Sequence, residues 1–288
     1  MHMEVGLLAL QTLRRAEAEV HLRASTTLFE WSRGAAVEAR NRAVMRRHAF
    51  EKSFGRDQPE PEIRERIDRR DYYLTLAGAA LANGFPTTAL PFAEKARLAA
   101  PLDPEVQLVF GCVAESLAQE ELLRHHQSEA ARLRDDAARA LREALALDPG
   151  ADEARLHLGW LLLVRGRLAE AEPVLEQMER RSGDDRQRYL ARLFLGRLAA
   201  QGGRQDEAAG FYRRALGAWP DSQAARLALS HALEVVTGPA AARPPVAASL
   251  AASQRLDRAT DPWWLYPFGP PGVAKAALDR LWKEGLDR

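Results

Sequence analysis

Apolar residues recur along most of the chain at spacings of three and four, and short polar breaks containing glycine or proline separate these stretches. Such spacing places the apolar side chains on one face of a helix. The strict alternation of apolar and polar residues that is typical of a β-strand does not occur in the sequence. The sequence therefore predicts an all-α fold.

Two stretches can be aligned directly: LHLGWLLLVRGRLAEAEPVLEQM at 156–178, and LFLGRLAAQGGRQDEAAGFYRRAL, which starts at Leu193. Both contain the pattern L-x-L-G, a second glycine seven residues later, and then a Glu-Ala pair. A pattern repeated at a fixed distance indicates one supersecondary unit that is stacked several times.

This pattern resembles the tetratricopeptide repeat, a unit of about 34 residues that forms two antiparallel helices. We align five copies, with expected starts at residues 70, 104, 152, 189 and 223. Position eight is small in every copy, as expected where the two helices of a repeat cross closely. These residues are Ala77, Gly111, Gly159, Gly196 and Ser230. Small or apolar residues are also expected at positions twenty and twenty-seven of the clean copies, namely Ala89, Ala171, Ala208, Ala96, Met178 and Ala215.

The spacing between the expected starts is uneven. Fourteen extra residues in the second copy predict longer helices that project beyond their neighbours, and three extra residues predict a longer turn around 182–185. The fifth copy has a clear first helix at 222–236, followed by an interruption at 237–246 and a renewed helix at 247–256. A last helix is predicted at 273–286.

The resemblance implies a right-handed α-solenoid of helical hairpins with a proline- and aromatic-rich C-terminal cap. The expected parts are an N-terminal helical segment at 1–56, a linker at 57–69, the repeat array at 70–236, and a degenerate last repeat with the aromatic segment and final helix at 237–288. Stacked repeats bury one another, so the ends of the stack need a cover.

In this family the first helices line a concave groove, and the resemblance places positions two, five, nine, twelve and thirteen toward it. The groove candidates are Asp71, Leu74, Glu105, Leu108, Cys112, Glu115, Glu153, Leu156, Trp160, Leu193, Arg197, Leu227 and His231. For the five leucines at position five, packing within the core is the favoured explanation. For Trp160, packing at a repeat junction is an equal alternative to a place in the groove. Lys and Asn are absent from positions two, five, six and nine, which argues against the repeats that clamp the carboxylate of a chaperone tail.

The stretch DPWWLYPFGPPG at 261–272 is the second candidate site, with the aromatic residues Trp263, Trp264, Tyr266 and Phe268. Its four prolines argue against any regular helix. Buried aromatic side chains could replace a missing repeat face. We expect a cap over the end of the stack, with a partner-binding aromatic patch as the alternative.

Charge and composition argue against some classes of function and bear on where the protein is located. The 41 basic and 40 acidic residues give a net charge of +1, so the chain as a whole has no attraction for nucleic acid. The basic runs at 40–47 and 64–70 are explained as solvated helix faces. No apolar run is long enough to span a membrane. The N-terminus is a poor signal peptide, so a cytoplasmic location is expected, with export as the alternative if a leader has been removed.

Residues for catalysis, metal binding or cofactor binding do not form a recognisable set in the sequence. The single cysteine, Cys112, is expected to be buried, and the adjacent His125 and His126 point in different directions on a helix. CxxC, HExxH, Walker and GxGxxG patterns are absent. We therefore expect no enzyme activity, no cofactor and no metal.

The leading hypothesis is a non-catalytic scaffold or adaptor that binds another protein or a second copy of this chain, without nucleic acid and without membrane insertion. An accessory subunit that binds a small ligand or cofactor near the aromatic segment is the alternative. RNA binding is a third hypothesis, which predicts a steep dependence of binding on salt.

Overall fold

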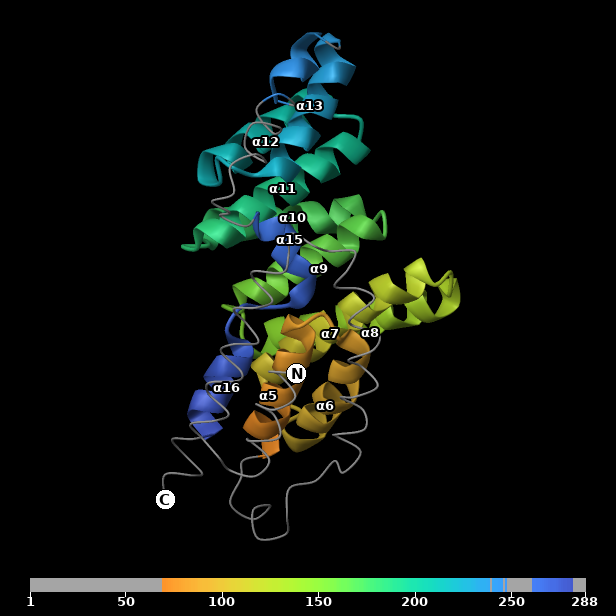
Figure 1. The fold of residues 1–288 in the computed structure, drawn as a ribbon, viewed down its shortest axis with the longest axis vertical. Coiled ribbons are helices and arrows are strands. Elements are labelled where there is room, and N and C mark those ends of the chain that lie inside the picture. Colours follow the sequence, from red (N-terminus) through yellow and green to blue (C-terminus); the bar gives the residue numbers. More distant parts are fainter. Residues whose placement is uncertain (1–68, 239, 246, 248–260, 282–288) are drawn as a thin grey trace. The chain divides into compact units, whose positions relative to one another are not determined.

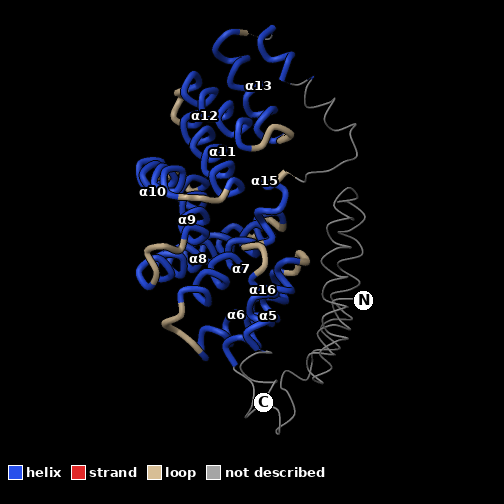
Figure 2. Tube along the Cα trace, turned by 90° about the vertical axis from the view of Figure 1, so that its left-hand side faces the viewer, coloured by secondary structure: helices blue, strands red, loops and turns tan. Residues whose placement is uncertain are grey.

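The computed structural model of the chain describes residues 69–238, 240–245, 247 and 261–281. All regular elements within these residues are helical, and Figure 2 draws no strand among them. The prediction of an all-α fold is therefore confirmed. The predicted N-terminal segment at 1–56, and the linker up to residue 68, lie outside the described residues.

The helices follow one another as antiparallel pairs (Figure 1). The first helices of the pairs are α5 (Arg69–Ala82), α7 (Pro104–Leu123), α9 (Asp152–Val164), α11 (Asp185–Gln201) and α13 (Gln223–Thr237). The second helices are α6 (Pro86–Ala99), α8 (Gln127–Leu147), α10 (Leu168–Arg181) and α12 (Gln205–Ala218). Three short elements follow toward the C-terminus: α15 (Pro262–Leu265), the 3₁₀-helix η2 (Tyr266–Phe268) and α16 (Val273–Leu281).

The chain forms two compact units, which we describe separately. Unit 1 comprises residues 1–140 and 268–288, and unit 2 comprises residues 141–267. The boundary between them in the sequence lies within α8. Within unit 1, α16 lies beside α5 although the two helices are far apart in the sequence (Figure 1).

Side-chain caps fix where three of the first helices begin. Asp103 accepts hydrogen bonds from the backbone N–H groups of Glu105 (2.9 Å) and Val106 (3.1 Å) at the start of α7. Asp184 accepts one from Gln187 at α11, and Ser222 accepts one from Ala225 at α13, each at 2.9 Å. These bonds satisfy donors that have no partner within the helix.

Left-handed residues make the turns within the pairs. Gly84, Gly166 and Gly203 have φ values of 76°, 72° and 77°, which glycine adopts at little cost. The second glycine of the repeated sequence pattern is thus explained for Gly166 and Gly203. In the α7–α8 turn the corresponding residue is His125, with φ of 64°, the only non-glycine among the described residues with a positive φ.

Close helix crossing explains the small residue at position eight. A Cβ atom added to Gly159 would overlap the Leu175 side chain of α10, and one added to Gly196 would overlap the Tyr212 ring of α12. The residues predicted at positions twenty and twenty-seven are all buried in the second helices, namely Ala89, Ala171, Ala208, Ala96, Met178 and Ala215. These predictions of packing are confirmed.

The effect of the extra residues differs between the two uneven spacings. Helices α7 and α8 have 20 and 21 residues, against 14 each in α5 and α6, so the predicted lengthening of the second pair is confirmed. The predicted longer turn at 182–185 is wrong, because only residues 182–184 separate α10 from α11. The extra residues instead extend the N-terminus of α11, which has 17 residues and begins at Asp185 under its Asp184 cap.

The predicted interruption after α13 is also wrong in part. Gly238, with φ of 88°, ends α13, but residues 240–245 are helical. The Ser230 hydroxyl donates to the Ala242 carbonyl at 3.0 Å, which holds this segment against α13. Pro244 and Pro245 lie within this helical segment, although each lacks the backbone N–H that would donate to the carbonyl four residues earlier. Apart from residue 247, the predicted helix at 247–256 lies outside the described residues.

Candidate functional site

The C-terminal segment, by which we mean residues 261–281, lies against first helices in each unit. In unit 2, α15 and Tyr266 pack against α9 and α11. In unit 1, α16 packs against α5. The first-helix surface, where the sequence predicts a binding groove, therefore already contacts a segment of polypeptide in both units.

Aromatic rings make the central contact in unit 2. Tyr266 is only 2% exposed, and its ring stacks on His157 of α9 with 4.5 Å between the centroids. It also meets Phe194 of α11 edge-on at 5.3 Å and lies parallel to Trp263 at 6.0 Å. Edge-on and offset geometries at these distances are the favourable ones for aromatic pairs.

Trp160 joins these rings to an exposed cation. Its indole lies 4.7 Å from the Phe194 ring and 5.0 Å from the Trp263 ring. The Arg197 guanidinium lies 5.1 Å from the Trp160 ring centroid, within the range of a cation–π contact. We call Trp160, Phe194, Trp263 and Tyr266 the aromatic cluster. It combines two rings from the helical array with two rings from the C-terminal segment.

Asp261 anchors the start of the C-terminal segment. Its side chain is buried and accepts hydrogen bonds from the Tyr189 hydroxyl (2.6 Å), the Ser222 hydroxyl (2.9 Å) and the Ala224 backbone N–H (3.0 Å). It also accepts the Trp263 N–H at 3.0 Å and so caps α15. Burial and the neighbouring Asp261 carboxylate raise the pKa of Tyr189 well above its ordinary value, which keeps the phenol protonated as a donor.

In unit 1 the C-terminal segment approaches helix α5 closely at two glycines. The backbone and Cβ of Ala274 in α16 lie 3.1–3.3 Å from the point where a Cβ atom of Gly78 would stand. Gly269 has φ of 76°, and a Cβ atom there would lie 2.6 Å from the Leu81 side chain. The small residue at position nine of the first repeat thus makes room for α16 on α5.

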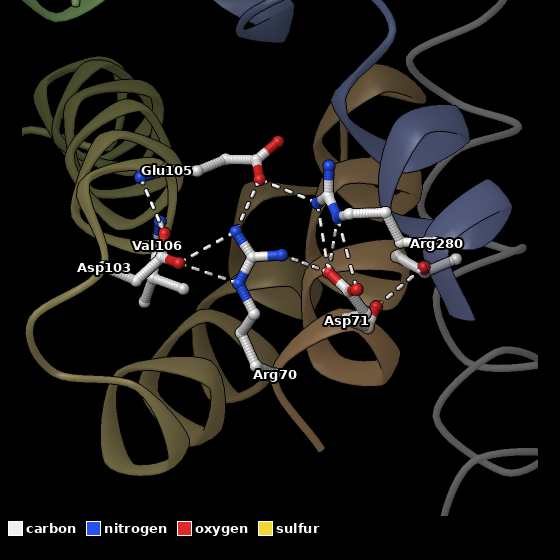
Figure 3. Close-up of polar contacts among 7 residues, drawn as sticks. Arg70, Asp71, Asp103, Glu105, Val106 and Arg280 are labelled. Carbon is white, nitrogen blue, oxygen red and sulfur yellow. Dashed lines mark hydrogen bonds and ion pairs between the residues drawn. The ribbon is translucent and has the colours of Figure 1, made fainter. Parts of the chain in front are cut away.

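Ion pairs fix α16 on the same surface (Figure 3). Arg280 donates to both carboxylate oxygens of Asp71, at 3.0 and 3.2 Å, and to Glu105 at 2.7 Å. Arg70 donates to the same Glu105 oxygen at 2.7 Å and to Asp103 at 2.9 Å, and it also pairs with Asp71. Two arginines and three carboxylates therefore join α5, α7 and α16.

This ion-pair network shifts the pKa values of two residues, Asp103 and Arg70. Burial acts to raise the pKa of Asp103, but hydrogen bonds from Arg70 and from the start of α7 outweigh it and hold the pKa below the ordinary value. Burial acts to lower the pKa of Arg70, yet the Asp103 hydrogen bond and the surrounding carboxylates raise it. Both shifts favour the charged forms.

Glu153, another predicted groove residue, connects two first helices of unit 2. Its carboxylate accepts from the Arg186 guanidinium at 2.8 and 3.1 Å and from the Gln187 amide at 2.7 Å. Burial acts to raise the pKa of Glu153, but the charge and hydrogen bonds of Arg186 lower it below the ordinary value. This side chain fastens α9 to α11.

The remaining groove candidates divide by exposure. Those that are buried and contribute to packing are Leu74, Leu108, Cys112, Leu156 and Leu193. Glu115 is partly buried. Arg197 and His231 are exposed, and Leu227 is 53% exposed on α13. The side chains of Trp264 and Phe268 lie outside the described residues.

The predicted cap needs a correction in its location. The aromatic segment does cover a surface of the stack, but its described rings contact α9 and α11 rather than the last pair. The reason is geometric, because Asp261 is fastened between Tyr189 of α11 and the start of α13, and the chain then continues over the earlier first helices.

Several residues of this surface were missed from the sequence, namely His157, Tyr189, Phe194, Ser222, Asp261 and Arg280. His157, Phe194 and Arg280 carry no local signal, because each acts on a residue distant in the chain. Asp261 does carry one, since Asp followed by Pro is the usual start of a helix.

Within the described residues, no three His, Cys, Asp or Glu side chains are grouped so that they could hold a metal ion. The helices between residues 69 and 281, where described, include none that could span a membrane.

Comparison with protein families finds two matches, both to models described as Tetratricopeptide repeat, at residues 130–193 and 182–223. A comparison with curated proteins finds no match. Among solved structures, "MamA 41-end from Desulfovibrio magneticus RS-1" matches with a TM-score of 0.54 and 18% identity over 67% of this chain and 99% of the other. A second, "Crystal structure of MamA protein", has a TM-score of 0.51 and 18% identity over 67% and 98% of the two chains.

These structural likenesses concern the fold, and they agree with the helical pairs described above. The family matches fall on the copies in which the repeat pattern is clearest. This all-α chain therefore contains tetratricopeptide repeats, which the family models match within residues 130–223.

Proposed function

We propose that this protein is a non-catalytic scaffold that binds a segment of another protein on its first helices. Neither family model that matches the chain describes an enzyme. Helical repeats present long surfaces that suit the binding of polypeptide. The proposal therefore concerns which surface binds and by what chemistry.

The observation that carries this proposal is the way unit 2 holds residues 261–267. The first helices supply hydrogen-bond donors to the Asp261 carboxylate and ring surfaces to Trp263 and Tyr266. Tyrosine, tryptophan and arginine are the residues that contribute most to protein interfaces. A surface that binds one irregular segment with such groups has the chemistry to bind another.

The array-side candidates for the partner surface are His157, Trp160, Phe194 and Arg197, because all four line one side of the aromatic cluster. Arg197 is the most accessible of them. The rings of the C-terminal segment are already engaged with Trp160 and Phe194, so we do not propose a small-ligand site there.

A charge-reversal pair tests the proposal. The full chain would be immobilised as wild type, Arg197→Glu and Arg213→Glu, and retained proteins would be identified by mass spectrometry. Arg197 is exposed on the first helix α11, whereas Arg213 is exposed on the second helix α12. The same charge change is thus made on two different faces.

We expect a partner that wild type and Arg213→Glu retain equally and that Arg197→Glu retains at least ten-fold less. Retention that Arg213→Glu abolishes and Arg197→Glu leaves intact would place binding on the second helices. That result, or the failure of every form to retain a partner, would contradict the proposal.

A further inference from the structure

We infer that the first-helix surface of unit 2 recognises an acidic–aromatic segment, with a carboxylate followed by aromatic residues two and five positions later, and that residues 261–267 occupy this surface as a built-in competitor. This inference rests on the proposed function and specifies the partner. The partner is a peptide segment of another protein with the same chemistry as Asp261, Trp263 and Tyr266.

The carboxylate requirement follows from the donors around Asp261. The array provides two hydroxyls, from Tyr189 and Ser222, and the Ala224 backbone N–H at the start of α13. A buried carboxylate is stable only when such donors satisfy it. The positive end of the helix dipole adds to the preference for an anion. A neutral amide would turn its own NH₂ group toward one of these donors.

The spacing requirement follows from the rings. Trp263, two residues after Asp261, meets Trp160 at 5.0 Å and Phe194 at 5.9 Å. Tyr266, five residues after Asp261, fills the space between His157 and Phe194. The short helix α15, capped by Asp261 itself, sets the distance between the anion and both rings.

Residues 261–267 behave as a ligand rather than as part of the repeat. They lie outside the repeat pattern, and the contact between Tyr189 and Asp261 joins residues 72 positions apart. The segment contributes a carboxylate and aromatic rings, and the array contributes side chains and the N-terminus of α13. A separate peptide with the same carboxylate and rings could make the same contacts. A tethered ligand acts at an effective concentration on the order of millimolar, so it competes strongly with a free one.

A labelled peptide with the sequence of residues 261–267 tests the inference by fluorescence anisotropy. Two full-length proteins are compared: the wild type and a variant carrying Asp261→Asn and Tyr266→Ala, which weakens the built-in segment but leaves the array unchanged. We expect the peptide to bind the variant at least ten-fold more tightly than the wild type. The same peptide carrying D261N and Y266A should not bind either protein.

Two further variants keep the test decisive. If the double variant fails to fold by circular dichroism, Tyr266→Leu alone replaces it, because leucine keeps an apolar contact. Adding Trp160→Leu to the variant should abolish peptide binding, which locates the peptide on the aromatic cluster. A folded variant that does not bind the peptide, or equal affinity for both proteins, would overturn the inference.

Measuring the oligomeric state tests whether the occupant of this surface is a second copy of this chain. If the wild type is a dimer that dissociates in the Asp261→Asn, Tyr266→Ala variant, the segment binds a second copy and the inference of a separate partner is wrong. The outcomes also separate this inference from the proposed function. If Arg197→Glu loses the partner and the segment variant retains it at the wild-type level, the scaffold proposal is supported and the inference of a built-in competitor is wrong. If the peptide binds but no partner is retained, the inference is supported and the scaffold proposal is wrong.

Discussion

Gly196 lies where α11 crosses α12, and the Tyr212 ring occupies the space that a side chain would need. The ring is buried and rigid, so it cannot move away as a flexible side chain would. We predict that Gly196→Ala lowers the free energy of unfolding by about 1–3 kcal/mol, the usual cost of overpacking a core. Thermal unfolding followed by circular dichroism measures this loss.

Gly217→Ala is the matched control for that substitution. Gly217 also lies in a helix, but an added Cβ atom would meet nothing within 4 Å. Alanine is the better helix former, so this variant should be as stable as the wild type or slightly more stable. Equal loss of stability in both variants would show that backbone flexibility, and not the Tyr212 contact, decides the choice of glycine.

Acid should destabilise the array through Asp103 and Glu153, whose pKa values are held below their ordinary range in the folded chain. A lowered folded pKa stabilises the fold above the unfolded pKa, which is about 4 for carboxyl groups. This contribution disappears as the pH falls through the folded pKa. We therefore predict a nearly constant melting temperature from about pH 7 to 5 and a steep fall below about pH 4.

Glu153→Gln tests which carboxylate contributes to that fall. The variant should melt at a lower temperature at pH 7, because Arg186 loses its charged partner. Its melting temperature should also depend less steeply on pH below about pH 4. The same steepness in variant and wild type would assign the acid sensitivity to other groups.

Helix α16 packs closely on α5 because Gly78 has no side chain, and Arg280 of α16 binds the carboxylates of Asp71 and Glu105. We predict that Gly78→Leu displaces α16, because even a Cβ atom at residue 78 would lie 3.1 Å from the Ala274 backbone. Hydrogen exchange measured by mass spectrometry should then increase across residues 273–281. Gly217→Leu, at an open position, should leave exchange in α16 unchanged.

The repeat pattern was sufficient to predict most elements of the array. Pattern positions such as Gly159, Gly196 and the buried alanines depend on contacts between neighbouring helices, so a local sequence pattern contains the information. The turn before α11 was predicted wrongly because the Asp184 cap, not the repeat length, fixes where that helix begins.

The location of the C-terminal segment could not be predicted in the same way. Its anchors, Asp261 and Arg280, bind Tyr189 and Asp71, and no periodic pattern relates these residues. The leucines and acidic residues of the predicted groove could be recognised by their position in the repeat. Whether they face solvent or a covering segment depends on contacts that follow no repeated pattern. Only the aromatic character of the covering residues was evident in the sequence.

For the protein as a whole, loss of the segment should expose apolar surface. We predict that Trp263→Ala with Tyr266→Ala increases the fluorescence of a hydrophobic dye and lowers the melting temperature, because Trp160 and Phe194 lose their covering rings. Lys275→Ala, at an exposed residue that pairs with Asp279 of the same helix, serves as the control and should change neither quantity. Unchanged dye fluorescence in the double variant would contradict this account.

The pairing of Arg280 with Asp71 has a consequence for biosynthesis, since 209 positions separate the two residues. A ribosome adds about 5–20 residues per second, and the N-terminal parts of a chain fold first. The helical pairs can form as they emerge, but α5 receives α16 only once residue 280 has been added to the chain. For roughly ten seconds or more the nascent chain therefore presents uncovered first helices, which is the interval in which a chaperone or a partner could engage them.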